Sequence, residues 1–181
     1  MGFQKFKANQ LFDGFHLLDT DHVLITDDQG TILDITSTAE AGDDVRTFDG
    51  ILAPGFINCH CHLELSHMKG VIPESTGLVK FVLTVVQQRN FPEQEILHSI
   101  EMAEDQMLAS GIVAVGDICN NALTIPQKSK GRIYYHNFIE VSGFNPLIAT
   151  QRFERSLGFF KEYAQLYGIP VESNSMVPHT P

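Results

Sequence analysis

A short apolar run that ends in two alternating histidines is the feature that most constrains this chain. Residues 51–57 are mostly apolar, and Asn58-Cys59-His60-Cys61-His62 follows directly. In a strand, successive side chains point to opposite faces, so His60 and His62 share one face, about 6 to 7 Å apart. Both imidazoles can therefore reach one ion. The sequence predicts a strand that carries a metal site at its end.

A histidine pair supplies part of a metal site and not the whole of it. Imidazole nitrogens bind zinc at about 2.0 to 2.1 Å, and a catalytic zinc keeps three protein ligands and an open position for water. His60 and His62 give two of these ligands. The same alternation directs Cys59 and Cys61 to the other face, where we expect small buried apolar residues and not ligands.

From Ile51 onward, short apolar segments alternate with amphipathic ones. This pattern predicts a parallel sheet with helical crossovers. One helical stripe consists of Leu78, Phe81, Val82, Val85 and Val86, and a second of Ile96, Ile100, Ala103 and Met107. Both stripes have the spacing of a helix with one apolar face, and we expect both to pack in the core.

The first 50 residues have a different pattern. An apolar segment at residues 22–26 is followed by the turn residues 27–30 and a second apolar segment at residues 31–35. This order predicts a β-hairpin in which Gly30 adopts a positive φ. We expect a small antiparallel β unit here.

Four segments in order resemble the first four barrel strands of the amidohydrolase superfamily. They are residues 50–62, with a Pro-Gly entry before the His-x-His pair, then residues 111–117, residues 138–143 and residues 177–181. The last segment, Val-Pro-His-Thr-Pro, resembles the Pro-His-x-Pro-Tyr ending found in one branch of that superfamily. This branch holds aminohydrolases, nucleobase and nucleoside deaminases and chlorohydrolases.

The resemblance implies an α/β fold: a partial (β/α)₈ TIM-type barrel of about four βα units, preceded by a small β-sandwich portion. Residues 1–50 would be the amino-terminal part of the flanking β-sandwich, and residues 51–181 the first half of the barrel. A complete barrel typically needs about 250 residues, and residues 51–181 supply about half of them. We therefore expect a truncated chain whose open sheet is covered by self-association, as a homo-oligomer, or by a complementing carboxy-terminal chain.

The resemblance also implies the roles of the site residues. His60 and His62 would bind a divalent metal ion, zinc with iron as the alternative, and His179 would contact the substrate. Glu64 shares the face of the two histidines if their strand continues, so it is a second substrate-binding candidate, with a solvated loop glutamate as the alternative. In relatives the third metal histidine and the acid/base glutamate lie on the fifth strand, and a metal-binding aspartate lies on the eighth. We therefore assign no catalytic residue in this chain.

The implied activity is a metal-dependent hydrolysis that deaminates or dechlorinates a heterocyclic small molecule, such as a purine-type base or nucleoside. We expect the isolated chain to be inactive, because the acid/base group of the family is absent. Two alternatives remain open. The chain is a metal-binding fragment without turnover, or it is an interaction module that needs a second chain to complete the barrel.

Other polar residues have both a functional and a structural interpretation. Asp117 and Glu140 lie late in predicted strands, where barrel active sites form, and each is either a pocket residue or a structural carboxylate. His67 follows the end of the predicted strand, so we expect a loop histidine or one that supports a ligand. His136 lies earlier in its strand, which favours a hydrogen-bonded core or interface histidine.

Composition excludes some classes of partner. The net charge is −10 and no basic cluster exists, so we expect no nucleic acid and no membrane as partners. The expected partners are a small-molecule substrate and the second chain that covers the open sheet. Three cysteines, an odd number, give no disulfide framework and indicate a cytoplasmic location. The amino terminus has no apolar core of signal-peptide length.

Overall fold

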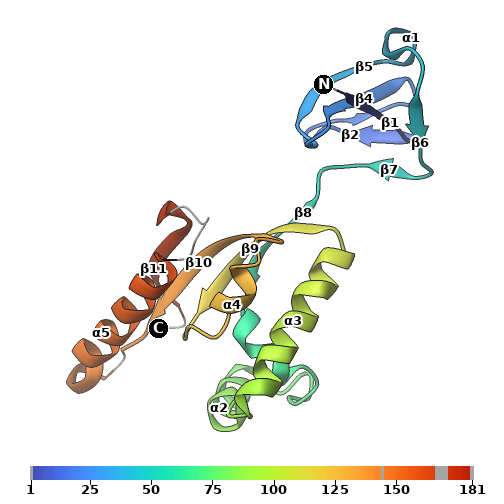
Figure 1. The fold of residues 1–181 in the computed structure, drawn as a ribbon. Helices are drawn as coiled ribbons and strands as arrows, with labels where there is room; N and C mark the ends of the chain where they lie inside the picture. The colour runs from blue at the N-terminus through green and yellow to red at the C-terminus, as the bar shows by residue number, and fades with distance from the viewer. Residues whose placement is uncertain (1, 144, 166–170, 180–181) are drawn as a thin grey trace. The chain divides into compact units, whose positions relative to one another are not determined.

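The computed structural model describes residues 2–143, 145–165 and 171–179. The chain forms two compact units, Met1–Pro54 and Gly55–Pro181, each of which is described by itself. Figure 1 labels the helices and strands of both units. The sequence placed its boundary between residues 50 and 51, whereas the structure includes Ile51 and Leu52 in the first unit, where they pair with another strand.

The first unit contains two small sheets. Its elements are β1 (Phe3–Lys7), β2 (Gln10–Phe12), β3 (Leu17–Leu18), β4 (His22–Asp27), β5 (Ile32–Ser37), α1 (Thr38–Ala41), β6 (Val45–Thr47) and β7 (Ile51–Leu52). The predicted hairpin is confirmed, because β4 and β5 pair antiparallel and Gly30 has a φ of 85°. The unit is not purely antiparallel as expected, since β1 pairs with β6 and β2 with β7 in parallel.

The second unit alternates strands and helices. Its elements are β8 (Phe56–Cys61), η1 (Leu63–Met68), α2 (Leu78–Gln88), α3 (Glu93–Ala109), β9 (Ile112–Cys119), α4 (Ile125–Lys128), β10 (Tyr134–Val141), α5 (Pro146–Tyr163), η2 (Val171–Ser173) and β11 (Asn174–Pro178). The four strands form one sheet in the order β11-β10-β9-β8. Every neighbouring pair is parallel. The predicted α/β arrangement with helical crossovers is confirmed.

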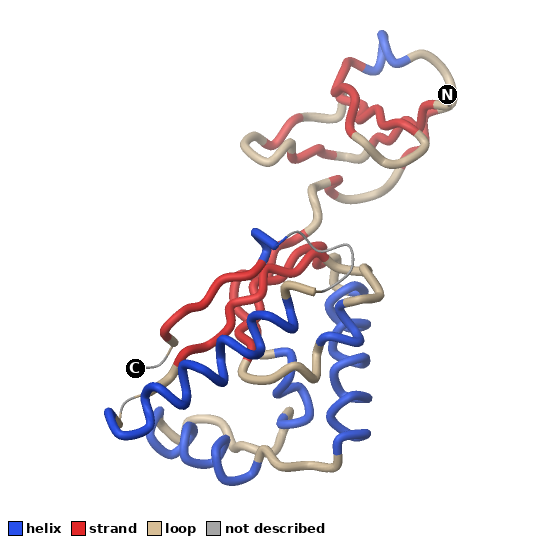
Figure 2. Tube along the Cα trace, turned by 60° about the vertical axis from the view of Figure 1, so that its left-hand side comes forward, coloured by secondary structure: helices blue, strands red, loops and turns tan. Residues whose placement is uncertain are grey.

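Helices α3 and α5 cover the same face of this sheet. Val115 of β9 and Tyr135 of β10 pack against Ile96 and Ile100 of α3. Farther along the same strands, Cys119 and Ile139 pack against Tyr163 of α5. Val115 is in register with Tyr135, and Cys119 with Ile139, and the two residues of each strand are four apart, so all four point to one side of the sheet. Figure 2 shows the helices in blue against the strands in red.

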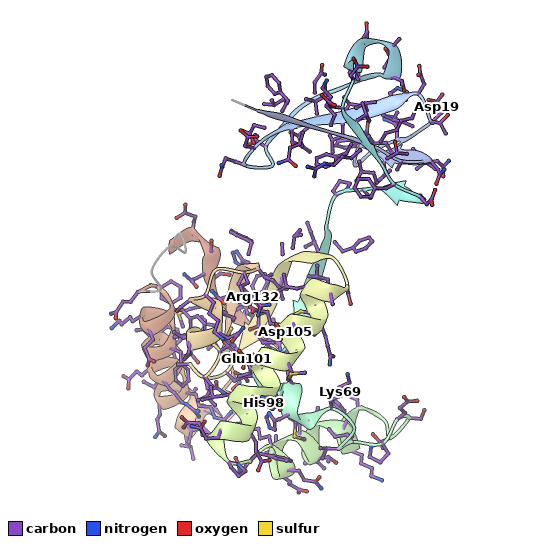
Figure 3. The ribbon with its side chains drawn as sticks, turned by 45° about the vertical axis from the view of Figure 1, so that its right-hand side comes forward. Asp19, Lys69, His98, Glu101, Asp105 and Arg132 are labelled. Carbon is purple, nitrogen blue, oxygen red and sulfur yellow. The ribbon has the colours of Figure 1, made fainter. Side chains whose placement is uncertain are left out.

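Helix α3 is also held by polar contacts to Arg132, which precedes β10, and to Tyr135 of β10. The guanidinium of Arg132 lies 2.6 Å from a carboxylate oxygen of Asp105, and Figure 3 labels both residues. The buried carboxylate of Glu104 accepts a hydrogen bond of 2.9 Å from the hydroxyl of Tyr135. These contacts hold α3 against β10 as well as against β9.

The two predicted apolar stripes have different outcomes. The stripe of α3 is confirmed as core, because Ile96 and Ile100 are buried and Ala103 and Met107 pack against them. The stripe of α2 is not in a core, since no residue of this helix is buried. Among the described residues, no helix has both the length and the apolar character needed to cross a membrane.

Candidate metal centre

Three histidines from distant parts of the chain converge on one point. His60, His62 and His179 each offer one ring nitrogen, and these nitrogens lie within 4.8 Å of one another. The Nε2 atoms of His60 and His179 are 3.3 Å apart. His60 is exposed and the other two are half-buried, so the cluster opens to solvent.

The cluster spans the width of the sheet. His60 lies in β8 and His179 follows β11, which are the two outer strands of four. Neighbouring strands lie about 4.8 Å apart, so the outer strands of a flat sheet would be about 14 Å apart. The two side chains therefore meet over the middle of the sheet. They lie at the carboxyl ends of the strands, where α/β folds place their sites.

Glu140 of β10 orients His179. Its Oε2 lies 3.4 Å from Nδ1 of His179 and accepts a hydrogen bond of 2.8 Å from the side-chain amide of Asn120. With Nδ1–H pointing to the carboxylate, the lone pair of Nε2 is directed to the cluster. Carboxylate partners of this kind fix the tautomer of metal-binding histidines. Glu140 was either a pocket residue or a structural carboxylate, and this geometry favours a pocket residue that faces the site.

The residues present fit a metal ion. Two nitrogens bound to a tetrahedral zinc at about 2.0 to 2.1 Å lie about 3.3 to 3.4 Å apart, which matches the spacing of His60 and His179. The Nδ1 atom of His62 is buried and has no hydrogen-bond partner among the described residues. Burial, followed by the nearby His179 and His60 rings, lowers the pKa of His62. The neutral imidazole that binds metals is therefore favoured.

Glu64 does not lie on the strand face that it was expected to share with His60 and His62. Strand β8 ends at Cys61, and Glu64 belongs to the 3-10 helix η1, so the strand does not continue as the prediction required. Its buried Oε2 accepts hydrogen bonds from the backbone N–H groups of Asn120 and Asn121, at 2.9 and 3.1 Å. Burial raises its pKa to about 7. A substrate-binding role for Glu64 stays a prediction.

The two cysteines beside the histidines, Cys59 and Cys61, differ in burial. Cys61 packs against the core, but Cys59 is exposed, so the expectation that both are buried is wrong for Cys59. The pairing of β8 with β9 has an irregularity between Asn58 and Cys61. This irregularity breaks the strict alternation on which the expectation rested.

Asp117 supports the site from the helix-covered face. Its Oδ1 accepts a hydrogen bond of 2.8 Å from the backbone N–H of Leu63, and its Oδ2 lies 2.6 Å from the ammonium of Lys128. Both side chains of this ion pair are fully buried, and Lys128 also donates to the side chain of Asn137 at 2.7 Å. Of the two roles considered for Asp117, a pocket residue or a structural carboxylate, these contacts support the structural one. The sequence analysis missed Lys128, whose segment reads as a solvated turn.

His136 and His67 have local partners outside the cluster. His136 Nε2 lies 2.9 Å from the hydroxyl of Ser175, in agreement with a hydrogen-bonded histidine. His67 Nε2 lies 3.0 Å from the backbone oxygen of Arg89, while its Nδ1 is buried without a partner among the described residues. Neither ring belongs to the cluster of His60, His62 and His179.

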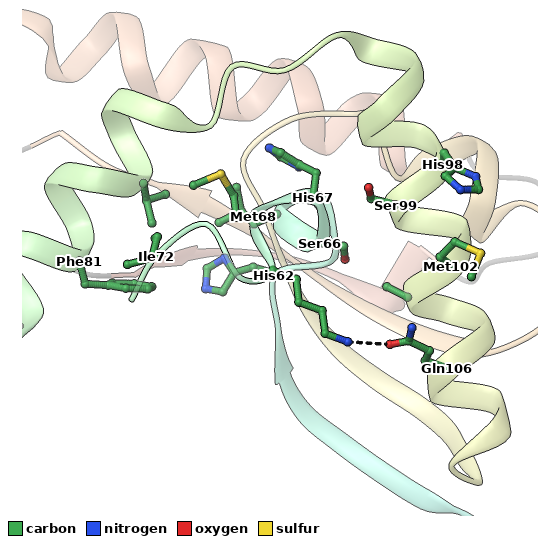
Figure 4. A pocket seen from close by; sticks show the side chains of 14 residues that line it. His62, Ser66, His67, Met68, Ile72, Phe81, His98, Ser99, Met102 and Gln106 are labelled. Carbon is green, nitrogen blue, oxygen red and sulfur yellow. Dashed lines mark hydrogen bonds between the residues drawn. The ribbon is translucent and has the colours of Figure 1, made fainter. Parts of the chain in front are cut away.

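A cavity of about 610 Å³ lies beside His62. Residues of η1, of the segment that follows it, of α2 and of α3 line the cavity. The lining is mostly apolar and includes Met68, Ile72 and Phe81. Figure 4 shows His62 together with these side chains and the hydrogen bond of 3.2 Å between Lys69 and Gln106. An organic molecule of modest size could therefore lie next to the histidine cluster.

No protein-family model and no curated protein matches the chain. Solved structures do match. Aminofutalosine deaminase of Helicobacter pylori, in complex with methylthio-coformycin, has a TM-score of 0.72 at 20% identity, over 97% of this chain and 43% of that protein. Guanine deaminase of C. acetobutylicum, with bound guanine, has a TM-score of 0.61 at 15% identity, over 98% and 46%. Atrazine chlorohydrolase of Arthrobacter aurescens TC1, complexed with zinc, has a TM-score of 0.61 at 18% identity, over 96% and 46%.

This chain has the fold of the amino-terminal portion of these enzymes. All three are of the amidohydrolase deaminase and chlorohydrolase type, so the resemblance drawn from the sequence motifs is confirmed at the level of the fold. The chain spans less than half the length of each of them.

Proposed function

We propose that this chain supplies the first metal ligands of an amidohydrolase-type hydrolase that deaminates or dechlorinates a heterocyclic small molecule. The observation that carries the proposal is the convergence of His60, His62 and His179 at the carboxyl ends of the sheet. The fold shared with two deaminases and a chlorohydrolase supports the same reaction class.

His60 and His62 would hold a divalent metal ion, with zinc favoured over iron because imidazole donors in a tetrahedral spacing suit zinc. When bound, such an ion activates water for hydrolysis at neutral pH. The chain's own residues supply the remaining tasks in this portion of the site. Glu140 holds His179 in one tautomer, and the apolar cavity beside His62 can exclude water around a bound ring.

His179 has two possible roles. The sequence motif assigns it to substrate, and its Nε2 lone pair would then accept a hydrogen bond from a ring N–H or an amino group. Its spacing of 3.3 Å from His60 also suits a third nitrogen ligand. We keep the substrate role as the proposal, because in the resembling branch this histidine contacts substrate, and we let metal analysis decide.

The deciding experiment is zinc analysis of purified variants after loading and dialysis. We expect His60→Ala and His62→Ala to lose the zinc and His179→Ala to keep most of it. His136→Ala is the matched control, because this ring is bonded to Ser175 and lies outside the cluster. Loss of zinc from His179→Ala equal to that from the other two would make His179 a ligand. Full retention of zinc in His60→Ala and His62→Ala would overturn the metal site.

Turnover is a separate readout. Ammonia release from aminopurine-type compounds would support deamination, and chloride release from chlorinated ring compounds would support dechlorination. The family's acid/base residue cannot be placed in these 181 residues, and its loss typically costs about 10² to 10⁴ in rate. We therefore expect this chain to turn over slowly or not at all. Zinc retention without any turnover would also agree with the alternative of a metal-binding module.

A further inference from the structure

One chain of hydrogen bonds joins η1, the short helix that follows β8, to His179. The Oε2 atom of Glu64 in η1 accepts hydrogen bonds from the backbone N–H groups of Asn120 and Asn121, at 2.9 and 3.1 Å. The side-chain amide of Asn120 donates a hydrogen bond of 2.8 Å to Oε2 of Glu140, and the same oxygen lies 3.4 Å from Nδ1 of His179. The carboxyl ends of all four strands are thereby linked.

The register of the sheet explains why these side chains meet. Cys119 of β9 and Ile139 of β10 are in register, and both pack on the helix-covered face. Asn120 and Glu140 come directly after this pair, so they lie side by side on the opposite face. His179 lies two residues beyond the partner of Glu140 in β11, which brings its ring to that face as well.

Asn120 holds the carboxylate that faces His179. The side chain of Glu140 is only 9% exposed, so its oxygens depend mainly on donors of the protein. At Oε2 the amide of Asn120 is the closer donor, at 2.8 Å against 3.4 Å for the ring nitrogen. The amide therefore fixes where Oε2 lies, and the ring of His179 follows it. Partners outside the ligand shell orient metal-binding histidines in this way.

Glu64 holds the backbone from which the side chain of Asn120 extends. Its side chain is buried, and both of its hydrogen bonds end on one oxygen, Oε2. The other oxygen, Oε1, has no hydrogen-bond partner among the described residues. A buried carboxylate is retained only where its hydrogen bonds offset the loss of hydration. The turn after β9 is where these hydrogen bonds go, so Glu64 and this turn hold each other in one conformation.

We propose that Asn120 and Glu64 are positioning residues for His179. Glu64 fixes the turn at residues 120 and 121, Asn120 fixes Glu140, and Glu140 selects the tautomer of His179 that carries its proton on Nδ1. The inference rests on the proposed function, because it takes His179 as a residue of the site. Its test reads the ring of His179 in the zinc-free chain, whereas zinc analysis tests the metal site, so the failure of one is distinguishable from the failure of the other.

Ring ¹⁵N chemical shifts measure the ratio of the two tautomers of His179 at about pH 9, where imidazoles are neutral. The spectrum of His179→Ala assigns the signals. Asn120→Asp replaces the donor by a carboxylate that repels Glu140, so we expect the ratio of the Nδ1–H to the Nε2–H tautomer to fall by at least about 5-fold. An unchanged ratio in Asn120→Asp would overturn the proposal, whatever the Glu64 variants give.

Asn121→Asp is the matched control. It adds the same charge one residue later, and its carboxylate can still accept the hydrogen bond that the side chain of Asn121 accepts from the backbone N–H of Leu123. We expect the tautomer ratio of His179 to stay within about 2-fold of the original, because one hydrogen bond to a charged group is worth more than that. An equal fall in Asn120→Asp and Asn121→Asp would assign the effect to added charge and overturn the role of the Asn120 amide.

Glu64→Gln and Glu64→Ala test the other end of the chain of hydrogen bonds. Glutamine keeps the length of the side chain and one oxygen that can accept both backbone N–H groups, so Glu64→Gln should leave the tautomer ratio of His179 within about 2-fold. Glu64→Ala removes the acceptor and should lower the ratio as Asn120→Asp does. A fall in Glu64→Gln as large as that in Asn120→Asp would show that the charge of Glu64 acts on His179, and would overturn its positioning role.

Discussion

The backbone N–H of Leu63 donates a hydrogen bond of 2.8 Å to the buried carboxylate of Asp117. Leu63 follows His62 directly, so a carboxylate on the helix-covered face fixes the point where β8 ends and η1 begins. The same carboxylate is paired with Lys128. The position of a candidate metal ligand therefore depends on an ion pair on the other face of the sheet.

Removing one partner of this ion pair should be costly. We expect Lys128→Met to lower the free energy of unfolding by about 3 to 5 kcal/mol, because the charge of Asp117 remains buried without its partner. Urea unfolding measures this loss. The double variant Asp117→Asn with Lys128→Met should lose less than the sum of the two single variants. Additive losses would contradict the coupling of the two side chains.

Two glycines of the second unit should respond to alanine in opposite directions. A Cβ on Gly116 would lie 2.7 Å from the backbone oxygen of Cys59 on the neighbouring strand and 3.0 Å from the ring of Phe138. Gly116→Ala should therefore destabilise the unit by about 1 to 3 kcal/mol. Gly158 lies in α5 with open space around it, and Gly158→Ala should stabilise the unit by about 0.5 to 1 kcal/mol. Thermal unfolding of the two variants checks both signs.

Thiol labelling should distinguish the cysteines as pH rises. Burial raises the pKa of Cys119 to about 12, and the thiolate is the reactive form, so the folded chain should label at exposed Cys59 and not at Cys119 between pH 7 and 10. The raised pKa means that the folded state holds this proton more tightly than the unfolded state. Its contribution to stability is complete below pH 9 and is lost as the pH approaches 12. Mass spectrometry of labelled peptides reports the site, and equal labelling of both cysteines at pH 8 would contradict the burial.

Glu140 should act on the site through His179. We expect Glu140→Ala to release Nδ1 of His179 and to populate both tautomers, which ¹⁵N chemical shifts of the ring resolve. If His179 binds the metal, the same variant should weaken zinc binding by about 10- to 100-fold. If His179 contacts substrate, zinc affinity should change little. Unchanged ring shifts in Glu140→Ala would show that the carboxylate does not hold the ring.

The sequence predicted those features that depend on local periodicity. The alternation expected for residues 58–62 predicted that His60 and His62 lie together, as they do, and the spacing of Ile96 and Ile100 identified the buried side of α3. Chain order and motif resemblance identified the parallel strands and the fold. These properties are repeated along a segment, so they are visible without knowledge of its neighbours.

Features that depend on contacts between distant segments were not predictable in the same way. Lys128 is a charged residue in a polar segment, and only the buried carboxylate of Asp117 explains its burial. Glu64 does not share a face with the histidines, because two backbone N–H groups after the end of β9 donate hydrogen bonds to its carboxylate. The α2 stripe has a core pattern, but the pattern does not identify the surface that covers it.

The contact between His60 and His179 joins residues separated by 119 positions in the chain. Contacts of such long range form late in folding, because the entropy of closing the intervening loop must be offset first by other structure. Both β9 and β10 lie between the two strands concerned, so they must be in place before the rings can meet. A partly folded chain can therefore present His60 and His62 without His179. A ligand that requires all three rings could bind only after the whole four-stranded sheet has formed. The complete site would therefore form only at the end of folding.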